Sequence, residues 1–304
     1  MKYRVLAGLL GLAVCVSCGG SGSSTPTNPG VTGTGNVFVV TQGDNLISPF
    51  LLDRAAGKMT ANGKGVATGS LPSAIIATPS GDGIFVLNTN SNDISRYTVK
   101  TDGTLAAVSP NIAVGGTNPI AMVMDGAGKL LFVLNQGTFG VQDGSVDVFK
   151  IGTSAALTGV DAGVSKAAEL DNASSIAVTP DGKYVYVTDS LVSHIIGYSV
   201  DADGGLTILP FFPSPQAPDP AHGILVGNPG GIVMVNATTP MGLLTTPDDP
   251  AKPSDNPIFL YVASVGTGQI SAYEICDKPS LNCTNNGRGP GDLLEITNSP
   301  FAAG

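Results

Sequence analysis

Short apolar runs alternate with turn residues along most of the chain, and residues 71–109 show this pattern most clearly. Gly and Asp in Ser80–Gly83 and in Asp102-Gly103 tolerate the backbone conformations of tight turns. The runs between these turns predict four strands, at Ala74–Thr78, at Ile84–Leu87, at Ile94–Val99 and from about Leu105 onward. A four-stranded antiparallel meander of this size cannot bury both of its faces alone, so we expect similar neighbours along the chain.

The same two strand patterns recur five times. The core of the second strand recurs as Val37–Val39, Ile84–Val86, Leu131–Val133, Val185–Val187 and Leu260–Val262. The third strand reads apolar-x-x-aromatic-x-apolar, beginning at Ile47, Ile94, Val146, Ile195 and Ile270. The central aromatic residues of the second strands are 47, 47, 54 and 75 residues apart, close to the roughly 40–50 residues of one propeller blade. We therefore predict an all-β β-propeller of four-stranded blades; a β-sandwich with chance similarity is the alternative.

The first 17 residues have the composition of a secretory signal peptide. Lys2 and Arg4 precede an apolar run from Val5 to Val16, which is too short to span a bilayer as a helix. The run ends at Val16-Ser17-Cys18-Gly19, which resembles the lipobox of bacterial lipoproteins, although Cys15 stands where that family prefers Leu. We expect cleavage after Ser17, acylation of Cys18 and anchoring to the outer membrane; an ordinary signal cleaved nearby is the alternative.

Residues 18–35 are rich in Gly, Ser, Thr and Pro and predict a flexible tether, so residues 36–304 hold the folded propeller. Charged residues make up 12% of the chain, against roughly 25% in an average domain. The net charge of −9 argues against a nucleic-acid surface. The membrane, reached through the lipid anchor, and an envelope protein or a carbohydrate are the partners that we expect.

Cysteines and long loops mark further features. Cys276 and Cys283 lie in one loop after the fifth third-type strand, and we expect a disulfide there in an oxidising compartment. A metal site at these two cysteines is the weaker interpretation, because no further ligand is near in sequence.

Residues 210–230 and 237–257 interrupt the even period as two insertions. No motif in the chain indicates a cofactor or a metal ion, and we expect neither.

Two of the units, beginning at Ile76 and Ile176, look like blades of the seven-bladed propeller lactonase family, which includes 6-phosphogluconolactonase-like proteins and shares its blade signature with YVTN-repeat surface proteins. The resemblance covers about residues 36–304 and implies a seven-bladed fold. Only five units are visible, so we expect either a smaller closed propeller or, in preference, an incomplete seven-bladed design.

The family's catalytic positions are where the resemblance weakens. Its histidine-bearing segment corresponds to Asp171–Ser175, which has no histidine, and its usual arginine corresponds to His194. Its Gly-Pro-Arg-His segment corresponds to Gly227–Gly231, where neither the arginine nor the histidine is present. Opening a lactone requires a positioned base or activated water and a cation for the developing oxyanion. We therefore expect a binding or scaffold module, with a lactone hydrolase as the alternative.

The two histidines of the chain and a nearby aspartate form one further candidate for a catalytic site. His194 and His222 are the only histidines, and propeller topology puts both on the same loop face, with Asp189 placed to orient one of them. Ordinary loop histidines are the simpler interpretation. Asp201–Gly205 has the beginning of a calcium loop but lacks its later Glu, and we expect a hairpin turn there.

Overall fold

The computed structural model describes residues 33–160, 170–209, 258–276 and 288–296, together with residues 14–16, 224–225, 229–236 and 299–302. These residues form two compact units, one of Met1–Ala113 with Gly152–Ala156, the other of Val114–Ile151 with Leu157–Gly304. Within the described residues no helix is long and apolar enough to cross a membrane.

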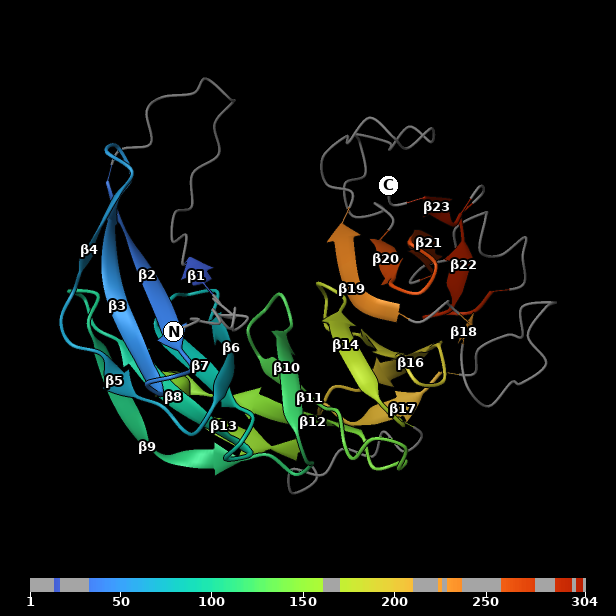
Figure 1. Cartoon of the computed structure of the whole chain (residues 1–304), viewed down its shortest axis with the longest axis horizontal. Coiled ribbons are helices and arrows are strands. Elements are labelled where there is room, and N and C mark those ends of the chain that lie inside the picture. Colours follow the sequence, from blue (N-terminus) through green and yellow to red (C-terminus); the bar gives the residue numbers. More distant parts are fainter. Residues whose placement is uncertain are drawn as a thin grey trace, which may run out of the picture. The chain divides into compact units, whose positions relative to one another are not determined.

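Five antiparallel sheets follow one another in chain order, which confirms the predicted class of fold (Figure 1). The first unit contains the first and second sheets. The first sheet consists of β1 (Val14–Val16), β2 (Thr34–Thr41), β3 (Leu46–Asp53) and β4 (Lys58–Ala61), with β5 (Val66–Ala67) also paired to β3. The second consists of β6 (Pro72–Ala77), β7 (Gly83–Asn88), β8 (Asp93–Val99) and β9 (Leu105–Ala113).

The second unit contains the other three sheets. The third consists of β10 (Pro119–Met124), β11 (Leu130–Asn135), β12 (Ser145–Ile151) and β13 (Leu157–Gly159). The short 3-10 helix η1 (Thr153–Ala155), which follows β12 in the sequence, belongs to the first unit. The fourth consists of β14 (Ala173–Val178), β15 (Tyr184–Asp189), β16 (His194–Val200) and β17 (Leu206–Ile208), with β18 (Ile224–Leu225) paired to β16. The fifth consists of β19 (Pro229–Asn236), β20 (Ile258–Ser264), β21 (Gln269–Ile275) and β22 (Leu293–Glu295), with β23 (Phe301–Ala302) paired to β21.

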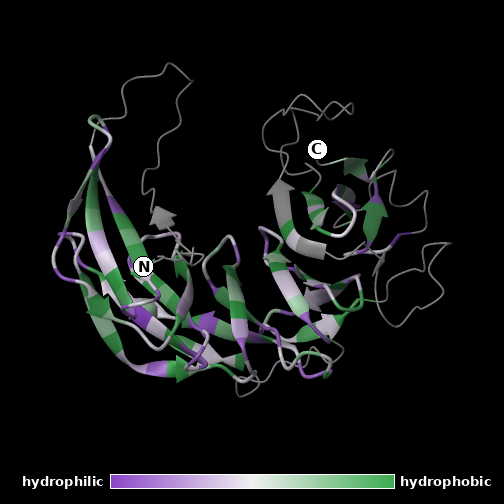
Figure 2. Cartoon of the chain, in the orientation of Figure 1, coloured by the Kyte–Doolittle hydropathy of each residue, from purple (hydrophilic) through white to green (hydrophobic). Residues whose placement is uncertain are grey.

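The second strand of each sheet is its most buried element, as the continuous apolar runs predict. Every residue of β7 and of β15 is buried. Between strands, the sheets carry hydrophilic turns, and Figure 2 shows hydrophobic colour concentrated in the strands. The first strands of the second to fifth sheets share a further feature, a shift of register at their second residue. The sheets are therefore copies of one structural unit.

The first sheet differs from the sequence-based expectation, which left its opening strand unassigned. Val14–Val16 occupies that place as β1, antiparallel to β2 with Val14 opposite Val39. The strand was not predicted because its residues lie inside the apolar run that we assign to the signal peptide. That assignment and the 36–304 boundary remain predictions.

Candidate functional site

The predicted catalytic residues lie where the second strand of the fourth sheet ends and the third begins. Asp189 is the last residue of β15 and His194 the first residue of β16, and the two are directly opposite in the antiparallel register. His194 is half-buried, and its neighbour on the other side is Leu225 of β18. His222 lies outside the described residues. The sequence correctly places Asp189 and His194 together, and the hydrogen bonds decide what Asp189 can do.

Asp189 is fully buried, and both of its carboxylate oxygens accept hydrogen bonds from main-chain N–H groups. Oδ2 accepts from the N–H of Asp171 at 2.6 Å and of Asn172 at 3.0 Å. Oδ1 accepts from the N–H of Leu191 at 2.9 Å and of Val192 at 3.3 Å. Every hydrogen bond that Asp189 accepts within the described residues therefore comes from the backbone, and none comes from a histidine. This carboxylate anchors two loops to the end of β15.

The third sheet has the same anchor in a different strand. Asp147 in β12 is fully buried, and its Oδ2 accepts from the N–H of Gly115 at 2.7 Å and of Gly116 at 3.3 Å. Asn135, at the end of β11, donates from Nδ2 to the same oxygen at 2.9 Å. The bonded loop is again the one that leads into the first strand of the sheet. Asp147 and Asp189 thus perform the same structural task.

The second sheet carries a neutral version of this anchor. Ser95 in β8 accepts through Oγ from the N–H of Gly69 at 2.9 Å, and Asn88 donates to the same oxygen at 2.9 Å. Asn88 also donates to Asp93 Oδ1 at 2.6 Å. Sequence reasoning missed this device, although its signal is present: a small polar residue follows the apolar residue that opens most third strands, as Ser48, Ser95, Asp147 and Ser271. In the fourth sheet this position is Ile196, and Asp189 performs the anchoring instead.

A hollow of about 670 Å³ lies at the opposite end of the third and fourth sheets. Three lysines and three aspartates line it, together with a mainly apolar remainder that includes Leu130, Ile151 and Val200; the charged residues are Lys129, Lys150, Lys183, Asp125, Asp181 and Asp201. We call this the lysine hollow. Sequence reasoning treated the turns that contribute these residues only as turns.

The aspartates of the lysine hollow close their own turns, whereas the lysines extend outward. Asp125 Oδ1 accepts from the N–H of Lys129 at 2.7 Å. Asp201 Oδ1 accepts from the N–H groups of Asp203 and Gly205, both at 2.8 Å, which confirms Asp201–Gly205 as a hairpin turn. The lysine side chains are exposed, and the ion pair of Lys150 with Asp203, at 2.9 Å, is 48% and 88% exposed. The ammonium groups are consequently within reach of a ligand.

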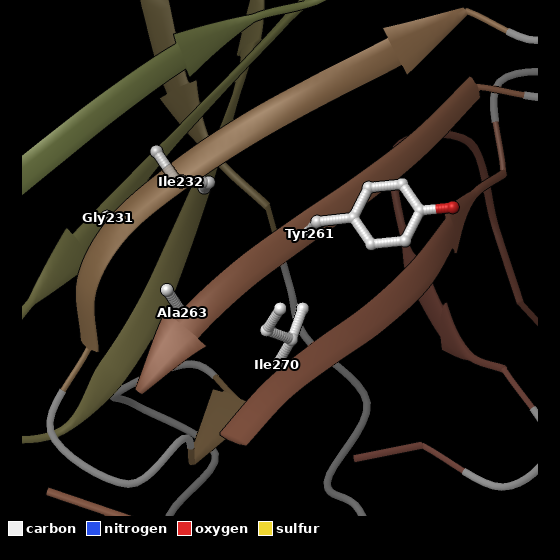
Figure 3. Close-up of a pocket in the computed structure, with 5 residues that line it drawn as sticks. All are labelled: Gly231, Ile232, Tyr261, Ala263 and Ile270. Carbon is white, nitrogen blue, oxygen red and sulfur yellow. The ribbon is translucent and has the colours of Figure 1, made fainter. Parts of the chain in front are cut away.

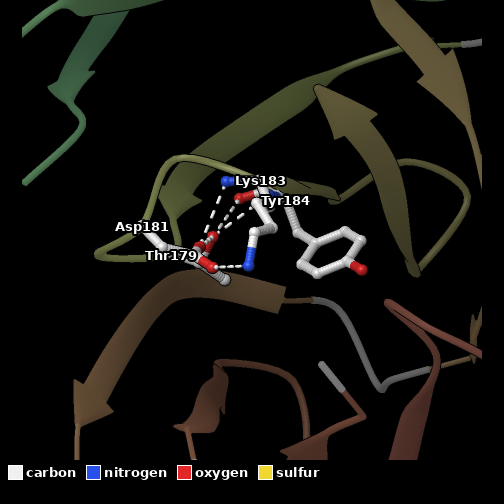
Figure 4. A network of polar contacts seen from close by, with 4 residues as sticks. All are labelled: Thr179, Asp181, Lys183 and Tyr184. Carbon is white, nitrogen blue, oxygen red and sulfur yellow. Dashed lines mark hydrogen bonds and ion pairs between the residues drawn. The ribbon is translucent and has the colours of Figure 1, made fainter. Parts of the chain in front are cut away.

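Figure 4 shows the turn that carries Lys183. Asp181 accepts through Oδ1 from the hydroxyl of Thr179 at 2.8 Å and from the N–H of Lys183 at 3.2 Å, and its Oδ2 lies 2.7 Å from Lys183 Nζ. Burial alone would raise the pKa of Asp181, but hydrogen bonds from Lys183 and Thr179 outweigh burial and hold the pKa below its ordinary value. The turn is therefore kept in one conformation with its carboxylate charged.

The two turns that flank the lysine hollow are fixed to each other. The N–H of Gly126 donates to the carbonyl oxygen of Pro180 at 3.0 Å. A Cβ atom at position 126 would lie 2.4 Å from that oxygen, so only glycine fits this approach. The lysine hollow is consequently preformed, as most small-molecule sites are.

A second, smaller hollow of about 300 Å³ lies on the fifth sheet (Figure 3). Its lining consists of Gly231, Ile232, Tyr261, Ala263 and Ile270, with the Tyr261 hydroxyl as the one polar side-chain group among them. This lining offers no acid, base or cation, so the hollow is suited to apolar packing and not to catalysis.

The remaining predicted sites lie partly outside the described residues. Cys276 is disulfide-bonded, whereas Cys283 falls outside the described residues, so the pairing of these two stays a prediction. Cys18, the predicted lipidation site, also falls outside them. Among the described residues no group of three or more His, Cys, Asp and Glu side chains could hold a metal ion.

Residues 37–164 match the family model described as the lactonase seven-bladed β-propeller. Solved structures match the fold over most of the chain: a candidate 6-phosphogluconolactonase from Bacteroides uniformis is 16% identical, with a TM-score of 0.61 over 91% of this chain and 69% of its own. A periplasmic gluconolactonase from Pseudomonas aeruginosa is 20% identical, with a TM-score of 0.60 over 89% and 68%. A protein of unknown function from Desulfotomaculum acetoxidans is 16% identical, with a TM-score of 0.56 over 96% and 76%.

A search of the curated proteins gives no match. The match over residues 37–164 and the shared folds of these structures support the interpretation of the five sheets as propeller blades.

Proposed function

We propose that this lactonase-family propeller acts as a binding or scaffold module of the bacterial cell envelope and not as a lactone hydrolase. The observation that carries the proposal is the hydrogen bonding of the Asp189 carboxylate. Its two oxygens accept four main-chain N–H groups, so this carboxylate has no role left as an acid–base partner for His194. A structural carboxylate at the one position where sequence suggested catalysis favours a fold used without the family reaction.

Ligand contact in this proposal lies at the lysine hollow. Its ammonium groups suit an acidic group, its carboxylates suit hydroxyl groups, and the side chains of Leu130, Ile151 and Val200 add apolar contact surface. A carbohydrate that carries an acidic group combines these features. Electrostatic contacts between exposed groups are individually weak, so we expect modest affinity from a single sugar unit.

Titration of the full chain with glucuronic acid, followed by NMR chemical shifts, tests the site. We expect saturable shifts at Lys129 and Lys183 that the double variant Lys129→Gln/Lys183→Gln abolishes. Replacement of Lys100, an exposed lysine just after β8, by Gln should leave these shifts unchanged. Neutral glucose supplies the control for the acidic group. Equal shifts with both sugars, or none with either, would remove the lysine hollow as the contact site.

Attachment to the outer membrane through acylated Cys18 belongs to the same proposal. Its support is the lipobox-like Val16-Ser17-Cys18-Gly19 after an apolar run. Metabolic labelling with radioactive palmitate should mark the wild-type chain and not Cys18→Ala. An unlabelled wild-type chain would leave a secreted, unanchored protein as the alternative.

A further inference from the structure

The second sheet buries an arginine at a position that carries no charge in the other sheets. Arg96 in β8 is only 7% exposed, and its neighbours in the antiparallel register are Phe85 of β7 and Val108 of β9. The same repeat position of the other third strands holds apolar residues or glycine, as Pro49, Val148, Gly197 and Ala272. The repeated strand pattern therefore does not require a cation here.

The guanidinium of Arg96 is only partly satisfied by hydrogen bonds. Nη2 donates to the carbonyl oxygen of Pro110 at 2.7 Å, and Nη1 donates to that of Ala155 at 3.5 Å. The buried Nε has no hydrogen-bond partner among the described residues. Arg96 also forms no ion pair within this part of the chain, and burial lowers its pKa because it disfavours the charged form. Arg96 is thus a buried cation that no described carboxylate neutralises.

One short segment closes over Arg96. Gly152–Ala156, which we call the strap, includes η1 and belongs to the first unit, and η1 contacts β7 and β8. Ala155 is 4% exposed, whereas the other four residues of the strap are exposed. Ala155 is therefore the buried residue of the strap, and its carbonyl oxygen is the acceptor that the strap offers to the guanidinium.

The strap is strained and weakly held. Ser154 has φ 56° and ψ 39°, and Ala155 has φ 56°, a left-handed conformation that is unfavourable for residues with a Cβ atom. The N–H of Gly152 closes the strap on itself by donating to the carbonyl oxygen of Ala156 at 2.9 Å. Among the described residues, the 3.5 Å bond from Arg96 is the only hydrogen bond that joins the strap to the second sheet. Segments with few such bonds open locally at low cost, and opening also relieves the strain.

We propose that the strap opens and that the uncovered guanidinium of Arg96 binds an oxyanion, the carboxylate or phosphate group of a ligand. A guanidinium presents a planar fork of N–H donors that matches two oxygens of such a group, and Nε is a donor that no described residue uses. In the closed strap the carbonyl oxygen of Ala155 stands in for one oxygen of the anion. This site shares no residue with the lysine hollow and goes beyond the function proposed above.

Chemical modification of the full chain by phenylglyoxal, mapped by mass spectrometry of its peptides, tests the opening of the strap. Proline holds φ near −65° and cannot adopt the φ of 56° at position 154, so Ser154→Pro keeps the strap open. We expect Arg96 to react at least tenfold faster in Ser154→Pro than in the wild type. Ser154→Ala, which retains a Cβ atom, is the matched control and should react like the wild type. The partly exposed Arg54 is the internal reference, and its rate should not change.

Protection from the same reagent tests the binding of an oxyanion. Inorganic phosphate and acetate are the probes, and sodium chloride at equal ionic strength is the control. Protection of Arg96 by phosphate alone would assign the site to phosphate groups, and protection by both probes would assign it to oxyanions in general. Protection of Arg96 and Arg54 to the same extent, or protection by neither probe, would overturn the proposal.

Calorimetric titration with phosphate gives the matching affinities. A closed strap reduces the apparent affinity by the fraction of molecules that are open, so Ser154→Pro should bind phosphate at least tenfold more tightly than the wild type. Arg96→Met in the Ser154→Pro background should abolish this binding. Binding that survives Arg96→Met, or an Arg96 reactivity that Ser154→Pro leaves unchanged, would contradict the proposal. If either variant fails to fold, protection of Arg96 by the two probes in the wild type decides.

Discussion

The two ends of the fourth sheet use carboxylates in opposite ways. At the β15–β16 end, Asp189 is completely buried and holds two loops through four main-chain N–H groups. At the β14–β15 end, Asp181 closes a single exposed turn and forms an ion pair with Lys183. Burial separates the two roles: the first end is rigid internal structure, and the second presents charge to the solvent.

This difference separates the end that the sequence favours for chemistry from the end at which we propose ligand contact. An aspartate next to a histidine is a reasonable acid–base pair when only the order of residues is known. In the fold, the same aspartate compensates for Ile196, which stands where other sheets have a small polar anchor. Groups committed to buried hydrogen bonds are unavailable for a ligand, so the exposed lysines carry the proposed contact.

Replacement of the buried anchor should have the largest effect. Asp189→Ala leaves buried N–H donors unsatisfied, and we expect a loss of about 3 kcal/mol in the free energy of unfolding. Asp203→Ala, which removes only the exposed ion pair with Lys150, should cost less than about 0.5 kcal/mol. Urea denaturation measures both. Equal stabilities for the two variants would contradict the division between a buried and an exposed end.

An intermediate effect is expected where the two turns beside the lysine hollow touch. Gly126→Ala places a Cβ atom 2.4 Å from the carbonyl oxygen of Pro180, so the turns must separate, at a cost of about 2 kcal/mol. Gly43→Ala, where a Cβ atom meets nothing within 4 Å, is the control. Thermal unfolding of both variants gives the comparison, and a Gly126→Ala variant as stable as its control would show that the hollow is not fixed.

Acid conditions should weaken the exposed end only slightly. The pKa of Asp181 lies below its ordinary value of 3.8 in the folded chain, so its contribution to stability is present above that pH and is lost as the pH falls through the lowered pKa. Asp181→Asn should therefore reduce stability at neutral pH by less than about 1 kcal/mol and by nothing below the lowered pKa. A constant difference across the acid range, measured by urea unfolding, would mean that the ionised carboxylate contributes nothing.

Much of the fold could be predicted from the sequence because each sheet buries its second strand on both faces. The runs at Ile84–Leu87 and Val185–Val187 are continuous for this reason, and they recur in register. Local patterns cannot reveal contacts made between sheets. The Gly126–Pro180 hydrogen bond depends on how two turns from separate sheets meet, which neither turn specifies alone.

The candidate site was only half predictable. Sequence order brings Asp189 and His194 together across a hairpin, and the structure confirms that proximity. The sequence does not reveal that the N–H groups of Asp171 and Asn172 point at Asp189, because the connection before β14 meets Asp189 only after folding. The sequence likewise does not reveal that Lys150 and Lys183 line one hollow, because Lys150 lies near the end of a strand of the third sheet and Lys183 in a turn of the fourth.

Hydrolysis of a panel of lactones that includes 6-phosphogluconolactone, followed by proton release at constant pH, tests the central claim most directly. The full chain is assayed beside His194→Ala, His222→Ala and Asp189→Asn. A binding module gives rates equal to the uncatalysed reaction for every lactone, with the wild type and with each variant that folds. Turnover by the wild type that His194→Ala or His222→Ala removes while the fold stays intact would contradict the account and restore the lactone hydrolase.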